Sequence, residues 1–399
     1  MGKFFNNFLR TNFFKFYLIF IFLFSVLFLS QKFLYPTDWT TSEWLINYQG
    51  GFVRRGLIGE VLINIHNYSE ITLRYLVFYF EILILLIFLF LIFKFFQNVY
   101  LNQFLIFLFF CPIFLIYPLA ENEVLVRKEY LLLSIYIFYL ILLLKNNYSF
   151  FLIILILLPI MNLIWDGMIF YIFFFIFSFF CKKNFKKKEI IYFIFSFLPY
   201  LISLFFIIIA KSDPIGFEKM CNSLNENCFG AMFALDKTLI WNIEYVTSRF
   251  KLEYLFTHLI IIILCFAPII LYSYFDNFKI YIGNFSLKKI LLKLNLLLIF
   301  SMLLFMLIGY DWGRWINIGY SFSILNLFFL IKNSNIDFYN NKISLFFDKF
   351  SMNNSKIFYF LFFCYTFTWN MKVIMTDDIG SFPYYRIITK SLKIISSYL

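Results

Sequence analysis

Hydrophobic residues recur along this chain in long runs, separated by short polar segments, from about residue 13 to residue 370. A run of about 18 apolar residues is long enough for a helix to cross the roughly 30 Å hydrocarbon core of a bilayer. Backbone groups in lipid find no water to bond, so such runs must form helices. The short alternating segments typical of a membrane β-barrel are not seen. The pattern therefore predicts an all-α, polytopic bundle of transmembrane helices.

We count about 11 spans, and 10 to 12 would fit the pattern. Their expected limits are 13–34, 71–93, 101–119, 130–144, 149–164, 168–181, 190–210, 255–274, 290–309, 317–331 and 357–370. The first run follows Lys3 and Arg10 and has no small-residue cleavage site after Ser30, so we interpret it as an uncleaved signal anchor. No internal repeat and no separate soluble segment is evident, so residues 1–399 are expected to form a single integral membrane domain.

Lysines gather in the segments 182–188, 279–293 and 332–356, each between two predicted spans. The positive-inside rule places these loops and the N-terminus in the cytoplasm. The outer segments are then 35–70, 120–129, 165–167, 211–254, 309–315 and the tail 371–399. The lysine loops also explain the net charge of +12, so a nucleic-acid partner is not expected. We expect a multi-pass protein of the bacterial cytoplasmic (inner) membrane.

Tryptophan and arginine are distributed unevenly between the two sides. All seven tryptophans and seven of the eight arginines fall in or beside the outer segments. An aromatic belt would populate both interfaces. Arginine is favoured over lysine where a planar fork binds phosphate or pyrophosphate. The active face is therefore predicted to be periplasmic and to recognise a phosphate.

The segment 35–70 is the richest in candidate site residues. They are Asp38, Trp39, Glu43, Trp44, Arg54 and Arg55. Asp38 directly follows the first span, so its carboxylate can reach a lipid-carried substrate and accept a proton as general base. Arg54 and Arg55 would face a lipid-linked phosphate, and the tryptophans would stack on sugar. The alternative is an ordinary interfacial loop with snorkelling arginines.

Three other outer segments carry further candidates. They are Glu121, Glu123 and Arg127 in the second segment, Asp166 in the third, and Asp311, Trp312, Arg314 and Trp315 in the fifth. The arginines would hold phosphate, the acids would assist, and Trp312 and Trp315 would stack on sugar. Solvated turns with weak ion pairs are the alternative. Glu81, inside the second span, either serves an ion path or pairs with a neighbouring helix.

Cofactor chemistry has little support in the sequence. The two histidines lack ligand spacing, and there is no HExxH, CxxC, haem or P-loop motif, so no cofactor is predicted and a divalent metal is unsupported. Cys221 and Cys228 in segment 211–254 either close a small disulfide loop or are a coincidental pair of thiols.

An acid directly after the first span, followed by a short arginine-bearing amphipathic stretch, resembles the GT-C superfamily of membrane glycosyltransferases. The likeness covers roughly the first 75 residues. It implies that Asp38 is the catalytic base, with Glu43 as a weaker alternative. The implied donor is a polyprenyl-phosphate or polyprenyl-pyrophosphate sugar, and the implied acceptor is a glycan or glycolipid of surface-polysaccharide assembly.

Two alternatives remain. O-antigen and capsule polymerases look similar at a coarse level, with one larger outer loop and outer arginines such as Arg249, Arg314 and Arg386. A transporter or flippase without chemistry would need polar residues at mid-membrane. Because the polar residues concentrate at one face, a surface active site is favoured over a pathway.

Overall fold

The computed structural model places most of the chain with enough certainty to describe it. The described residues are 2–36, 39–97, 103–182, 187–209, 214–222, 224, 226, 228, 230–232, 235, 237, 239–275, 281–282, 285–286, 306–333 and 342–398. Most of them are helical, and the strands among them form two short pairs. The all-α prediction is therefore confirmed.

Five of the described helices are long and apolar enough to cross a membrane. They are the part of α1 (Gly2–Leu34) from Phe14 onward, α4 (Leu73–Phe96), α11 (Lys187–Ile209), α14 (Leu252–Phe275) and α16 (Trp312–Lys332). Helices of this kind mark a membrane protein. The count of about 11 spans and their orientation stay predictions, and most of the predicted span 290–309 lies outside the described residues.

Shorter apolar helices occupy several of the other predicted spans. These are α7 (Glu129–Leu144), α8 (Phe150–Leu152) continued by the π-helix η2 (Ile153–Leu157) and α9 (Leu158–Ile164), the 3-10 helix η3 (Asp166–Phe170) with α10 (Ile172–Phe180), and α18 (Ser355–Phe367). The predicted limits 130–144 and 149–164 agree closely with them.

The predicted span 101–119 is not one continuous helix. α5 (Gln103–Phe109) ends before Pro112, and helix resumes only in the short α6 (Tyr117–Ala120). The break is buried, and side chains of α16 satisfy its carbonyl groups: the Asn317 amide donates to Ile113 and Phe114, and the Tyr320 hydroxyl donates to Leu108. Non-helical backbone is tolerated at such depth only when protein groups satisfy it.

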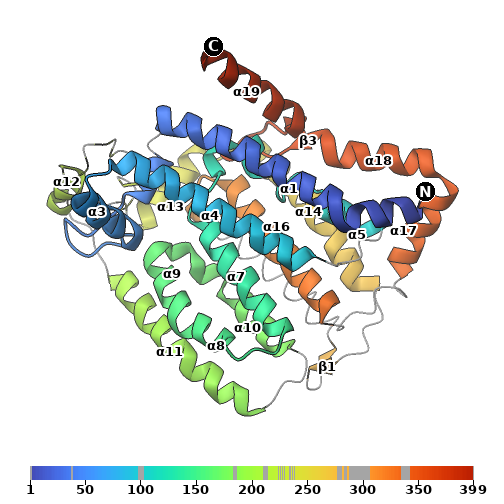
Figure 1. Cartoon of the computed structure of the whole chain (residues 1–399), viewed down its shortest axis with the longest axis horizontal. Coiled ribbons are helices and arrows are strands. Elements are labelled where there is room, and N and C mark those ends of the chain that lie inside the picture. Colours follow the sequence, from blue (N-terminus) through green and yellow to red (C-terminus); the bar gives the residue numbers. More distant parts are fainter. Residues whose placement is uncertain are drawn as a thin grey trace. The chain divides into compact units, whose positions relative to one another are not determined.

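The remaining described elements are short. They are α2 (Thr41–Trp44), α3 (Leu57–Ser69), η1 (Asn122–Val124), α12 (Pro214–Asn222), α13 (Leu239–Arg249), α17 (Lys342–Asn353), α19 (Pro383–Tyr398), and the antiparallel strand pairs β1 (Tyr281–Ile282) with β2 (Phe285–Ser286) and β3 (Trp369–Asn370) with β4 (Gly380–Ser381). Figure 1 labels most of them.

The described chain forms two compact units, each assembled from separate stretches of sequence. Unit 1 comprises Met1–Phe24, Phe96–Val124 and Leu239–Leu399, and unit 2 comprises Ser25–Phe95 and Leu125–Thr238. The prediction of a single integral membrane domain stays a prediction.

Unit 1 is built around α16, whose residues are buried along nearly the whole helix. Tyr320 packs edge-on against Phe266 of α14, with ring centroids 5.6 Å apart. At the start of α16, the Gly313 amide donates to the Val373 carbonyl at 2.9 Å. That contact ties the helix to the strand-bearing segment beyond α18.

Unit 2 contains a tight bundle in which α9 and α11 lie side by side (Figure 1). The buried Asn162 amide of α9 donates to the Ser203 hydroxyl of α11 at 3.0 Å. Cys221 and Cys228 form a disulfide at the end of α12. Glu226 lies inside that disulfide loop. Arg74, at the start of α4, donates two hydrogen bonds to its carboxylate, of 2.8 and 3.0 Å. This ion pair fixes the disulfide loop to α4.

We expect Gly313→Ala to destabilise unit 1. A Cβ at this position would overlap the backbone carbonyl of Lys372 more closely than real Cβ contacts allow. Overpacking of this kind costs about 1–3 kcal/mol. Thermal unfolding of the purified protein in detergent should show a lower midpoint.

Ser323→Ala on the same helix is the matched control. The Ser323 hydroxyl is buried and has no hydrogen-bond partner among the described residues, so its removal should leave the midpoint unchanged or slightly raised. Equal midpoints for Gly313→Ala and the wild type would contradict the packing described here.

Candidate functional site

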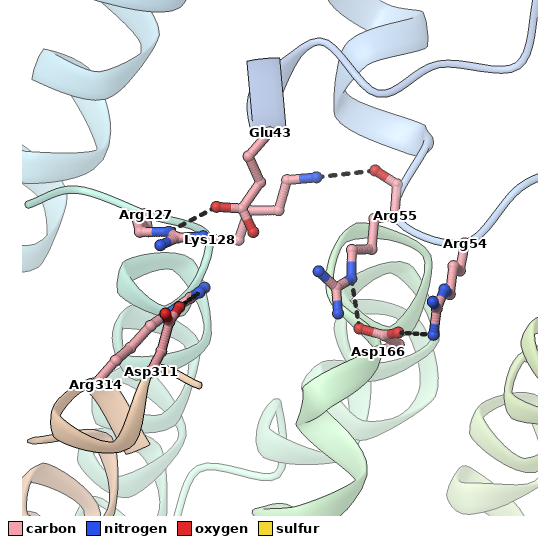
Figure 2. Close-up of polar contacts among 8 residues, drawn as sticks. All are labelled: Glu43, Arg54, Arg55, Arg127, Lys128, Asp166, Asp311 and Arg314. Carbon is pink, nitrogen blue, oxygen red and sulfur yellow. Dashed lines mark hydrogen bonds and ion pairs between the residues drawn. The ribbon is translucent and has the colours of Figure 1, made fainter. Parts of the chain in front are cut away.

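Unit 2 gathers charged side chains that are far apart in the sequence. This group, here called the Asp166 cluster, consists of Glu43, Arg54, Arg55, Arg127, Lys128 and Asp166 (Figure 2). Its members come from α2, from the turn before α3, from the residues that precede α7, and from the first residue of η3.

The backbone around the two adjacent arginines is tightly turned. Arg55 has a φ of 67°, in the left-handed region that a residue with a side chain rarely adopts. The next residue, Gly56, lies against the ring of Tyr48, and a Cβ there would overlap that ring. A strained residue of this kind persists only where its surroundings hold it, and such residues concentrate at functional sites.

Asp166 holds both arginine side chains. Its Oδ1 accepts from Nε of Arg55 at 2.6 Å, and its Oδ2 accepts from Nη1 of Arg54 at 3.3 Å. Burial raises the pKa of Asp166, but the attraction of Arg55 and Arg54 outweighs burial and holds the pKa below its ordinary value. Asp166 is therefore a fixed negative charge that orients two guanidinium groups, and it is a poor proton acceptor.

Lys128 fixes the same turn from the other side. Its side chain is fully buried, and Nζ donates to the carbonyl oxygen of Arg55 at 2.9 Å. The ammonium also lies 5.9 Å from the centre of the Trp44 ring. Burial lowers the pKa of Lys128 to about 7. Lys128 is thus a positioning residue for the left-handed Arg55.

Arg127, next to Lys128, pairs with a different acid. Its Nε donates to Oε2 of Glu43 at 2.7 Å, and both side chains are buried. The adjacent Trp44 donates its indole N–H to Glu81 of α4 at 3.1 Å. Glu81 is therefore a hydrogen-bond acceptor between helices, which is one of the two roles expected for it.

Positive charge exceeds negative charge in the Asp166 cluster. Three arginines face the two carboxylates of the cluster, and Lys128, with a pKa of about 7, adds positive charge only while it is protonated. The neighbouring buried Glu129 reduces the excess, which near neutral pH is small. Buried charge is costly unless it is compensated. The arrangement is suited to an anionic ligand, and forked guanidinium groups are well matched to phosphate oxygens.

Unit 1 carries a second polar group, here called the Glu121 cluster. Glu121 accepts hydrogen bonds from Arg386 and from the amide of Asn370, and Lys390 donates to the Ala120 carbonyl at 2.8 Å. Burial raises the pKa of Glu121 although Arg386 opposes that effect.

A separate ion pair joins Arg314 and Asp311 at 3.2 Å, and the Arg314 guanidinium lies 5.0 Å from the centre of the Trp315 ring.

The other predicted site residues have varied surroundings. Asp38 lies outside the described residues. Glu123 is exposed, and the Trp39 side chain is 52% exposed. Trp44 and Trp312 are buried and donate their indole N–H groups within the protein, to Glu81 and to the Met306 carbonyl. Trp315 is also buried. Of the four tryptophans expected to stack on sugar, Trp39 alone presents a largely open surface.

The sequence did not indicate Lys128, Asn370 or Lys390 as site residues, and Arg386 stood out only as one of the outer arginines. Lys128 stood between two other charges in segment 120–129, and nothing in the spacing indicated that it would be buried against Arg55. Arg386 lies 265 residues from its partner Glu121. The one feature of the sequence that could have indicated a role for Lys128 is its position next to Arg127, a candidate phosphate-binding residue.

No grouping of three or more histidine, cysteine, aspartate or glutamate side chains able to hold a metal ion occurs within the described part of the chain. Asp166, Glu43 and Glu121 are bound to arginine side chains.

We expect Lys128→Met to change how stability depends on pH. The folded protein disfavours the charged lysine, with a pKa of about 7 against 10.5 for an ordinary lysine. Between these values the unfolded chain binds a proton that the folded chain does not, so wild-type stability should rise with pH across this window. Lys128→Met removes the titrating group and should flatten the rise, as measured by thermal unfolding at several pH values.

Lys393→Met is the matched control, because Lys393 is exposed on α19. It should retain the wild-type slope. An identical slope for Lys128→Met and the wild type would show that Lys128 is not buried as described.

The chain was compared with known protein families, proteins and structures. No protein-family model, curated protein or solved structure matches the chain.

Proposed function

We propose that this chain is an integral membrane glycosyltransferase of the GT-C type, acting in bacterial surface-polysaccharide or glycolipid assembly. Its donor is a sugar linked to polyprenyl phosphate, and its acceptor is a hydroxyl of a glycan or glycolipid. The observation that carries the proposal is the excess of positive charge in the Asp166 cluster, held in place by Asp166 and Lys128.

The reaction needs stabilisation where charge develops. The acceptor oxygen forms a bond to the anomeric carbon of the donor sugar, and the bond between that carbon and the phosphate oxygen breaks. The departing lipid phosphate carries the negative charge away. Preorganised donors aimed at a developing anion supply a large share of catalysis in such sites. Arg54, Arg55 and Arg127 of unit 2 are assigned this role in the proposal.

A base must take the proton of the acceptor hydroxyl. Asp166 is held ionised by two arginines, and Glu43 is paired with Arg127, so neither is suited to accept a proton. Glu60 of the first predicted outer segment accepts hydrogen bonds from the Tyr48 backbone and the Gln49 amide. The proposal assigns Asp38, which directly follows the first predicted span, as the base. The resemblance of this segment to the GT-C superfamily supports the same assignment.

The proposal includes the predicted topology. The N-terminus lies in the cytoplasm, about 11 helices span the bacterial inner membrane, and the active face is periplasmic. Trp39, with its exposed ring, is assigned to stacking on sugar. The lysine-rich loops of the sequence support this orientation.

The test is a deletion strain complemented with the wild type or with single variants. We expect deletion to alter the surface glycan and the wild type to restore it. Asp38→Asn removes the base, and Arg55→Lys replaces the forked group held by Asp166 with a point charge. Neither variant should restore the glycan, and the loss of one anion-stabilising donor should slow transfer about 100-fold. Gel ladders and mass spectrometry of the glycan provide the measurement, with immunoblots of the membrane fraction to verify insertion.

Arg74→Lys is the matched control, since Arg74 lies in the same unit but pairs with Glu226 outside the Asp166 cluster. It should restore the glycan. A ladder that collapses to single repeat units would favour a polymerase, whereas a missing sugar or lipid modification would favour a single transferase. An intact glycan in the deletion strain would overturn the proposal and direct attention to transport.

A further inference from the structure

The last described helix, α19, has three distinct faces along its length. One face is buried and carries Ile387, Ser391 and Ile394, with exposed fractions of 0%, 4% and 5%. A second carries large exposed apolar side chains. A third carries polar and basic residues. At 3.6 residues per turn, these sets fall on separate sides of one helix.

The buried face is packed on unit 1. The helix lies against α6, and the Tyr384 ring lies 4.6 Å from that of Phe367 in α18. Arg386 and Lys390, at the border of this face, bind Glu121 and the Ala120 carbonyl. α19 is therefore fixed in orientation by its own unit, and the direction of its other two faces is determined.

The exposed apolar face consists of Tyr385, Ile388, Leu392 and Ile395. Their exposed fractions are 67%, 48%, 61% and 46%. The spacing of three, four and three residues keeps these side chains in one stripe along the helix. An apolar stripe that is contiguous, exposed and rigidly held marks an interaction surface.

The polar face lies beside the stripe and carries Thr389, Lys393 and Ser396, with Arg386 and Lys390 toward the buried side. α19 contains three basic residues and no acidic residue. At 16 residues it is about 24 Å long, shorter than the roughly 30 Å hydrocarbon core, and its basic face excludes it from a spanning position.

We propose that α19 lies in the plane of the membrane, with the Tyr385–Ile388–Leu392–Ile395 stripe embedded among the acyl chains at the headgroup boundary of an anionic bilayer. An apolar stripe beside a basic stripe on a helix too short and too polar to span is the pattern of interfacial helices. Arg386 and Lys390 bind within unit 1, and Lys393, which is exposed on the polar face, complements anionic headgroups. The buried face of α19 remains on unit 1, so lipid, α6 and water each contact one side.

This placement has a consequence for the Glu121 cluster. Arg386 and Lys390 belong to the helix that rests on the lipid, and they bind Glu121 and Ala120 directly. The Glu121 cluster is thereby held at the depth of the headgroups. The inference does not rest on the proposed glycosyltransferase activity.

The test measures depth in the full-length protein reconstituted into vesicles of POPC and POPG in a 3:1 ratio. Nitroxide labels are attached to single cysteines at Ile388→Cys and Leu392→Cys on the stripe, and at Thr389→Cys and Lys393→Cys on the polar face. The background is Cys364→Ala, because the other free cysteines among the described residues are buried and Cys221 is bonded to Cys228. Collision with oxygen, which concentrates in lipid, is compared with collision with a water-soluble nickel complex.

We expect the ratio of oxygen to nickel collisions to be several-fold higher at the two stripe positions than at the two polar positions. Nickel collision at Leu392→Cys as frequent as at Lys393→Cys would place the stripe in water and overturn the proposal. Shielding of the stripe positions from both reagents would show a protein surface covering the stripe, which also overturns it. Two labels on each face keep the comparison valid if one variant fails to reconstitute.

Discussion

The contact between Asp166 and the adjacent arginines 54 and 55 is the interaction on which the site in unit 2 depends. Two neighbouring guanidinium groups repel each other, and removing them from water adds a desolvation cost. A half-buried carboxylate that accepts from both resolves that conflict and fixes their directions. Lys128 then anchors the backbone carbonyl of Arg55, whose left-handed conformation needs such support.

The need to satisfy buried backbone groups governs the broken helix of unit 1. The chain leaves helical geometry between α5 and α6, which frees carbonyl groups in an apolar interior. Asn317 and Tyr320 of α16 donate to those carbonyls, so α16 acts both as the central packing element and as the source of hydrogen bonds for a broken helix. Its almost complete burial follows from that double role.

These pairings divide the acids into different chemical classes. An acid held by two arginines, such as Asp166, stays ionised and orients its partners, whereas burial raises the pKa of Glu121. The distinction separates residues that position cations from residues able to exchange a proton. Trp44 is part of the protein interior for a separate reason. Its N–H donates to Glu81, and the Lys128 ammonium lies over its ring.

The sequence by itself determined that the chain is helical and belongs in a membrane, because apolar runs of this length allow no other backbone arrangement in lipid. It also located segments 35–70, 120–129 and 165–167 as the places where charge collects. Only the tertiary structure decided the partners: Arg55 meets an acid 111 residues away, and Lys128 meets a carbonyl 73 residues away. Periodicity reports which face of a helix is apolar but carries no information on which distant segments meet. The break near Pro112 was missed for a related reason. An apolar composition indicates that a segment is buried, but it does not indicate whether side chains of a neighbouring helix bond the backbone groups that a break leaves free.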